Sequence, residues 1–219
     1  PAIICSARLS RMLDHSHPEH SPVGRHLHEG QAHFREGRAQ QAVHSYDRAV
    51  ALEPGNAEAL AWVKDHLRQK RLYGDLRDVL VAAARSGLDA NEKKQILREL
   101  AGLCEQQLRD VEGAIQALKQ LVSLDRGDSG AGESLRRLLE KSSRWDELAS
   151  VLEEEAMGAS DVEEKLALEK KLAQLHETKR KDLVGAAEAW ARIANLTPQD
   201  DQAVWTAVKL FEKAEKADL

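Results

Sequence analysis

The sequence predicts an all-α protein made of a stack of short helical hairpins, and three observations lead to this fold class. Residues 37–54 align without a gap on residues 109–126 and again on residues 181–198, so the chain repeats every 72 residues. From Val23 onward, apolar or small residues recur three and four positions apart, which is the period of a helix. Aromatic residues make up 4% of the chain and charged residues 32%, and this composition is typical of solvent-exposed helices.

Four columns of apolar residues carry the repeat. They contain Ala42, Ala114 and Ala186; Tyr46, Leu118 and Trp190; Ala49, Leu121 and Ile193; and Leu52, Leu124 and Leu196. Residues 73–80 match residues 145–152 at the same 72-residue offset and lie between the columns above. Each 72-residue interval therefore contains two units. Units this small cannot bury an apolar face alone, so each one must pack against its neighbours. Stacks of this kind are suited to binding and seldom to catalysis.

The chain divides into an extension and an array. Residues 1–22 lie outside the repeat, and we expect them to be partly helical or irregular. From residue 23 to 219, each helical run ends in polar or glycine-containing residues that favour turns. The expected repeats span about 23–56, 57–93, 94–128, 129–165 and 166–200, followed by a capping helix over 201–219.

The expected packing residues follow the helical period in each repeat. They are Leu60, Val63, Leu67, Tyr73, Leu76, Leu80 and Ala83 in the second repeat; Leu97, Leu100, Ala101, Cys104, Ala114, Leu118 and Leu121 in the third; Leu135, Leu139, Trp145, Leu148 and Leu152 in the fourth; and Leu172, Ala173, His176, Ala186, Trp190 and Ile193 in the fifth. In the capping helix, the expected packing stripe is Val204, Val208 and Phe211.

The first repeat carries a known pattern. Gly30, Ala42, Tyr46, Ala49 and Pro54 have the spacing of the tetratricopeptide repeat (TPR), so residues 23–56 resemble one full member of that family. In this pattern Gly and Ala let paired helices approach closely, the aromatic ring fills the gap between pairs, and Pro ends a helix. The resemblance implies a right-handed α-solenoid of about five helix-turn-helix repeats plus a C-terminal capping helix, with the first helix of each pair lining a concave binding surface.

Three residues on each first helix, spaced by four and then three positions, are expected on that surface. The trios are Leu27, Gln31 and Phe34; Ala61, Asp65 and Arg68; Arg98, Gly102 and Glu105; Glu133, Arg137 and Glu140; Lys170, Gln174 and Glu177; and Trp205, Lys209 and Glu212. The residues predicted to bind a partner are Leu27, Gln31, Phe34, Trp62, Asp65, Arg68, Arg98, Glu99, Arg137, Lys170, Lys171 and Trp205.

Two groups among these residues have alternative interpretations. Phe34, Trp62 and Trp205 are either hot spots for a partner or wedges against a neighbouring helix. The basic residues either clamp an acidic segment of a partner or are simply solvated and neutralised by nearby acids. They are Arg98, Arg137, Lys170 and Lys171, and the nearby acids are Glu99, Glu133 and Glu140. Some TPR proteins grip a C-terminal carboxylate with Lys and Asn, and Leu27 and Gln31 stand here where the first such pair is expected.

Other function classes find little support. The net charge is −5 and the pI about 6.0, so we expect no nucleic-acid partner. No run approaches the roughly 20 apolar residues of a membrane span. No catalytic motif is present, and Cys104 is expected to be a buried packing residue, so we expect neither an enzyme nor a cofactor. Residues 14–20 contain three histidines without rigid metal-ligand spacing, so we expect no metal site.

The sequence therefore predicts a protein–protein interaction scaffold that binds a peptide, a helix or a folded partner. Two cysteines without a disulfide framework favour the cytoplasm, and the first residue, Pro1, indicates a piece of a longer protein. Two alternatives stay open. The array is either a homodimer joined through its ends, with Phe211, Trp205 and residues 1–13 as exposed apolar surface, or the regulatory arm of a larger enzyme or machine.

Overall fold

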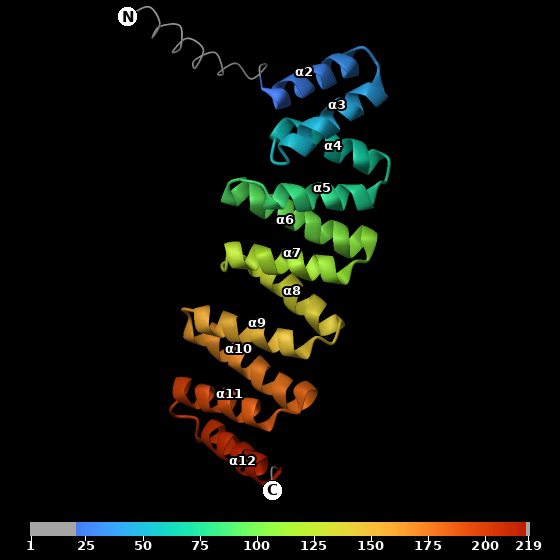
Figure 1. Ribbon diagram of the computed structural model, residues 1–219. Helices are drawn as coiled ribbons and strands as arrows, with labels where there is room; N and C mark the ends of the chain where they lie inside the picture. Colours follow the sequence, from blue (N-terminus) through green and yellow to red (C-terminus); the bar gives the residue numbers. More distant parts are fainter. Residues whose placement is uncertain (1–20, 218–219) are drawn as a thin grey trace, which may run out of the picture. The chain divides into compact units, whose positions relative to one another are not determined.

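The computed structural model describes residues 21–217, and in this range the chain forms helices and no strands (Figure 1). The predicted all-α class is confirmed. The chain divides into two compact units, Pro1–Leu121 and Val122–Leu219, which we call unit 1 and unit 2. The predictions made for residues 1–20 lie outside the described residues.

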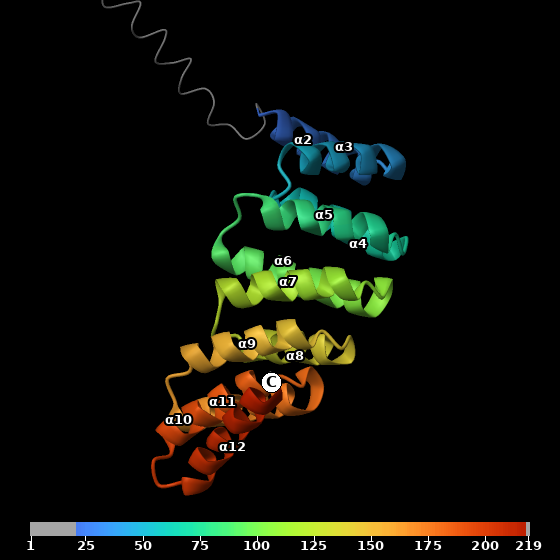
Figure 2. The ribbon, with the colours of Figure 1, turned by 60° about the horizontal axis from the view of Figure 1, so that its bottom comes forward.

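In each unit most helices pack against the next helix along the chain, from α2 to α6 in unit 1 and from α8 to α12 in unit 2 (Figure 2). Unit 1 contains α2 (Pro22–Arg35), α3 (Ala39–Leu52), α4 (Ala57–Gln69), α5 (Tyr73–Arg85), α6 (Ala90–Leu103), the π-helical turn η3 (Cys104–Leu108) and most of α7 (Val111–Leu124). Unit 2 contains α8 (Ser129–Lys141), α9 (Trp145–Gly158), α10 (Val162–Leu175), the π-helical turn η4 (His176–Arg180), α11 (Leu183–Leu196) and α12 (Asp201–Ala217).

The helices repeat at the 72-residue interval of the sequence, since α4, α8 and α12 begin at residues 57, 129 and 201. Ala42, Ala114 and Ala186 are fully buried, as a column of packing residues must be. The fourth column differs, because Leu52 and Leu124 keep 55% and 41% of their surface exposed. The repeat in the sequence therefore reflects a real core, but not every apolar column belongs to it.

Gly30 has the packing role that the TPR pattern implies. A Cβ atom at this position would lie 2.9 Å from Cε2 of the Tyr46 ring. Tyr46 is buried in α3, so its ring lies directly on the backbone of α2. A larger residue at position 30 would push the two helices of the first pair apart.

Helix starts differ from the expected repeat starts at residues 94 and 166, which fall inside α6 and α10. The reason is N-capping. The Asp89 side chain accepts hydrogen bonds from the backbone of Asn91 and Glu92, and Glu92 completes a capping box, so α6 begins at Ala90. The Asp161 carboxylate accepts from the backbone N–H of Glu164 and starts α10 at Val162.

The turns between paired helices each contain one residue in the left-handed region. These residues are Gly37, Arg71, Arg109, Ser143 and Lys181. Between α6 and α7, and again between α10 and α11, a five-residue π-helical turn precedes the left-handed residue. The first helical segment is therefore longer in these two pairs than in the others.

The packing stripe predicted for the last helix is wrong. Val204, Val208 and Phe211 are exposed, and α12 buries its small residues Ala203, Ala207 and Ala214 instead. Both sets of residues follow the helical period, so periodicity alone cannot distinguish them. Small side chains allow α12 to approach α11 closely.

Candidate partner-binding surface

The first helices of unit 1 are joined by polar side chains. Gln31 of α2 donates a hydrogen bond to Glu58 of α4, and Arg68 of α4 donates to Glu99 of α6. Arg68 Nη1 also donates to Asp65 Oδ1 over 3.2 Å, and Lys64 pairs with Glu99. We call Gln31, Glu58, Lys64, Asp65, Arg68 and Glu99 the unit 1 network. Four of the predicted partner-binding residues meet there.

A hollow of about 300 Å³ lies beside this network, and we call it the unit 1 hollow. Its lining residues are Arg68, Tyr73, Leu76, Glu99, Gly102, Leu103, Gln106 and Gln107. Leu76 and Leu103 are buried, whereas the two glutamines are exposed. A Cβ atom on Gly102 would meet nothing within 4 Å, so this residue leaves the hollow open.

Tyr73, Gln106 and Gln107 line the unit 1 hollow, but the sequence did not predict them as binding residues. The two glutamines come from η3, the π-helical turn that follows α6. The left-handed residues 71 and 109 are farther apart than 37 and 71, and η3 lies within the longer interval.

The aromatic residues of unit 1 form a cluster. The Trp62 ring stacks on Tyr46, with ring centroids 4.4 Å apart, and on His66 at 5.2 Å. Phe34 packs edge-on against Trp62 at 6.4 Å but keeps 62% of its surface exposed. Trp62 thus packs between helices, while Phe34 presents its ring to solvent. Leu27 is half-buried on the same helix as Phe34.

The basic residues predicted as a clamp are exposed. Arg98 lies in unit 1, whereas Arg137, Lys170 and Lys171 lie in unit 2. The clamp stays a prediction. Trp205 of α12 is 65% exposed and also belongs to unit 2.

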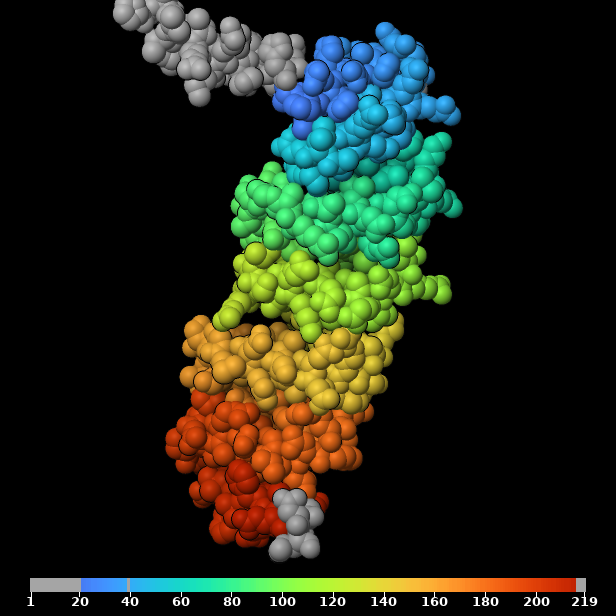
Figure 3. Space-filling view, in the orientation of Figure 1, coloured from blue at the N-terminus to red at the C-terminus, as the bar shows by residue number. Residues whose placement is uncertain are grey.

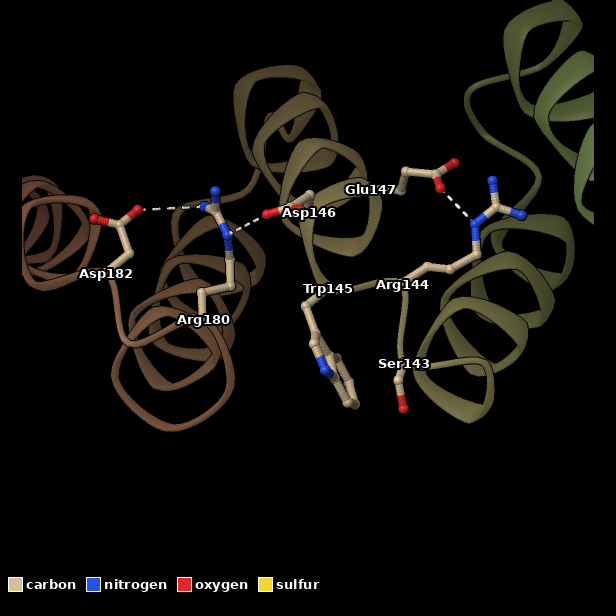
Figure 4. A pocket seen from close by; sticks show the side chains of 7 residues that line it. All are labelled: Ser143, Arg144, Trp145, Asp146, Glu147, Arg180 and Asp182. Atoms are coloured by element: carbon tan, nitrogen blue, oxygen red, sulfur yellow. Dashed lines mark hydrogen bonds and ion pairs between the residues drawn. The ribbon is translucent and has the colours of Figure 1, made fainter.

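A second hollow of about 510 Å³ lies in unit 2 and is lined by Ser143, Arg144, Trp145, Asp146, Glu147, Arg180 and Asp182 (Figure 4). Arg180 lies between two carboxylates, with Nε donating to Asp146 Oδ1 over 2.9 Å and Nη1 3.4 Å from Asp182 Oδ2. Trp145 occupies the place that Tyr73 has in unit 1, and Lys179 Nζ lies 5.2 Å from the centroid of its ring. Both hollows therefore adjoin a π-helical turn.

A buried histidine contacts Asp182, one of the residues that line the unit 2 hollow. His176 exposes 2% of its surface, and its Nδ1 lies 3.1 Å from Asp182 Oδ2. The pKa of Asp182 is lowered, mainly because its carboxylate accepts the backbone N–H of Gly185 and also because His176 and Arg180 are close. Cys104 holds the equivalent place in unit 1, where it is fully buried as expected, and burial raises the pKa of its thiol.

Within residues 21–217, no three His, Cys, Asp or Glu side chains come together to hold a metal ion. His15, His17 and His20 lie outside the described range. None of the helices described is both long enough and apolar enough to cross a membrane.

Comparisons with known proteins give solved structures only. No protein-family model matches the chain, and no curated protein matches it. MamA has a TM-score of 0.39 and 15% identity, over 90% of this chain and 96% of that protein. YrrB, described as a TPR protein with an unusual peptide-binding site, has a TM-score of 0.41 and 16% identity, over 89% of this chain and 95% of that protein. A chain in the structure of Naa15/Naa10 bound to HypK-THB has a TM-score of 0.49 and 13% identity, over 95% of this chain and 37% of that chain.

Proposed function

We propose that the chain is a protein–protein interaction module and that the first helices of unit 1 bind an extended segment of a partner protein. The observation that carries this proposal is the unit 1 network with its adjoining hollow. Bonds between α2, α4 and α6 hold Gln31, Arg68 and Glu99 in place before a partner arrives. A surface that is already ordered loses little entropy on binding, so modest contacts give useful affinity.

The chemistry of the hollow favours a polypeptide main chain. The carboxamides of Gln106 and Gln107 each donate and accept hydrogen bonds, as the N–H and C=O groups of an extended segment require. Arg68 and Glu99 neutralise one another, so the hollow has no strong charge of its own. Leu76 and Leu103 supply an apolar surface for one side chain of the segment. An uncharged extended segment with an apolar side chain fits this lining.

The proposal is tested by filling the hollow. A library of random 12-residue peptides is selected on the wild-type chain, and the recovered peptides are then measured on Gly102→Phe. A side chain can be introduced at this position because a Cβ atom at Gly102 would meet nothing within 4 Å. We expect Gly102→Phe to weaken binding of the recovered peptides at least tenfold.

Gly158→Phe is the matched control, because Gly158 also has open space around its Cβ and lies at the end of α9 in unit 2. It is expected to bind the same peptides as the wild type. Circular dichroism confirms that both variants stay helical. If Gly102→Phe retains full affinity, the proposed binding surface is wrong.

A further inference from the structure

Four large apolar residues lie exposed on α12. Val204, Trp205, Val208 and Phe211 keep 47%, 65%, 43% and 40% of their surface in solvent. Val204, Val208 and Phe211 follow one another by four and three residues, so they form a continuous stripe along one helix face, with Trp205 at its edge. We call these four residues the α12 stripe. The helix is drawn in red in Figure 3, where it forms part of the surface of unit 2.

The α12 helix stands in the same register as α8 and α4. Ala59, Ala131 and Ala203 recur at the 72-residue interval, and all three are buried. In α8, the positions that correspond to Val204, Val208 and Phe211 are held by Gly132, Arg136 and Leu139. Their surroundings show what normally lies over this face.

In the α8–α9 pair, the second helix covers this face. Arg136 donates a hydrogen bond to Glu155 of α9, and a Cβ atom on Gly132 would lie 2.8 Å from Glu155 Oε1. Leu139 is fully buried.

The same face of α4 is also covered. Leu60 and Leu67, which correspond to Val204 and Phe211, expose only 6% and 9% of their surface, and α5 packs on α4. Lys64, which corresponds to Val208, pairs with Glu99 of α6. In both repeats this face is therefore covered by helices that follow in the chain.

We propose that the α12 stripe binds an amphipathic helix of a partner protein, which takes the place that α9 takes on α8. Helix α5, which packs on α4, shows the pattern such a helix needs, because Leu76, Leu80 and Ala83 are buried at spacings of four and three residues. Trp205, at the edge of the stripe, supplies a large aromatic anchor. This surface lies in unit 2 and is independent of the unit 1 hollow, so either proposal can fail alone.

The test uses a fluorescein-labelled peptide with the sequence of residues 73–85 and the full 219-residue chain. Fluorescence anisotropy is expected to show saturable binding to the wild type. Val208→Glu places a charge in the middle of the stripe and should weaken binding at least tenfold. Val184→Glu, which changes an exposed valine of α11 in the same unit, should bind like the wild type.

Three results would overturn the proposal. They are no saturable binding by the wild type, equal affinity for Val208→Glu and the wild type, and saturable binding by a peptide in which Leu76 and Leu80 are replaced by serine. Light scattering adds a fourth outcome. A wild-type dimer that Val208→Glu converts to a monomer would show that a second copy of the chain, and not a partner helix, covers the stripe.

Discussion

Three glycines of this chain lie in different environments. Gly30 lies beneath the Tyr46 ring, and Gly37 has a φ of +74°, which other residues adopt only at a cost. Gly102 has neither constraint, because a Cβ atom there would meet nothing within 4 Å. The same substitution to alanine is therefore expected to have a different effect at each position.

Gly30→Ala should lower the free energy of unfolding, because overpacking costs about 1–3 kcal/mol and outweighs a gain in helix propensity of about 1 kcal/mol. Gly37→Ala should lower it by about 1 kcal/mol through backbone strain. Gly102→Ala should raise it by up to about 1 kcal/mol. Urea unfolding followed by circular dichroism measures all three. If Gly30→Ala and Gly102→Ala change the free energy of unfolding in the same direction, this explanation is contradicted.

Glu169 of α10 is a buried carboxylate with a defined partner. It exposes 3% of its surface, and both of its oxygens accept from Arg192 Nε, at 2.9 and 3.0 Å. The equivalent residue in the preceding long pair is Leu97, which is fully buried. A buried ion pair is seldom more stabilising than an apolar residue of similar size, but a buried charge without its partner is costly.

Arg192→Ala should therefore lower the free energy of unfolding by about 2 kcal/mol, since it removes a charge-assisted bond to a buried group. Glu169→Leu in the same chain should restore most of the loss, because leucine is already accommodated at the matching position. Urea unfolding of the wild type, both single variants and the double variant completes the cycle. If the change in the free energy of unfolding of the double variant equals the sum of the two single changes, the contribution of Glu169 to stability does not depend on Arg192.

At the scale of elements, the sequence predicts the helices better than the turns. The 72-residue columns identify α3, α7 and α11, because Ala42, Ala114 and Ala186 must be small wherever two helices meet. The π-helical turns escape periodicity, because η3 and η4 continue the preceding helix without a break in its polar pattern. Since Gln106 and Gln107 lie on η3, part of the candidate site is missed for the same reason.

The start of α11 depends on one titrating carboxylate. Asp182 is the N-cap, and its pKa lies below the ordinary value of 3.8, chiefly because it accepts the backbone N–H of Gly185. A carboxylate with a lowered pKa in the folded state contributes stability above the unfolded pKa, and this contribution is lost as the pH falls through the folded pKa. The cap is thus expected to be intact at neutral pH and to weaken only in acid.

Asp182→Ala should cost about 1 kcal/mol at pH 7, the usual loss for a removed N-cap. The difference from the wild type should shrink as the pH falls below 3.8, because protonation then weakens the wild-type cap. Asp182→Asn keeps a capping oxygen without the titration and should stay close to the wild type at pH 7. Thermal unfolding between pH 2 and pH 7 measures these differences. A gap that widens in acid would mean that Asp182 is not the stabilising group.

At the scale of the whole molecule, helices pack mainly on their neighbours in the chain. In unit 1, α4 packs against α3 and α5, and in unit 2, α10 packs against α9 and α11. The sequence predicts this arrangement, because a short repeat has no other apolar surface to meet. It does not predict where the chain divides into units, since Leu121 and Val122 lie together inside α7 and no change of composition marks them.

Nearest-neighbour packing implies that damage stays local. Leu172 of α10 is fully buried, and its replacement by alanine is expected to cost about 2–5 kcal/mol. Hydrogen exchange followed by mass spectrometry should show faster exchange in α9, α10 and α11, with protection in α2 to α4 unchanged. Leu76→Ala in α5 should give the opposite pattern, with faster hydrogen exchange in unit 1 and unchanged exchange in α10 to α12. Uniform loss of protection in both variants would mean that the chain unfolds as one cooperative block, because only then does one cavity reach every helix.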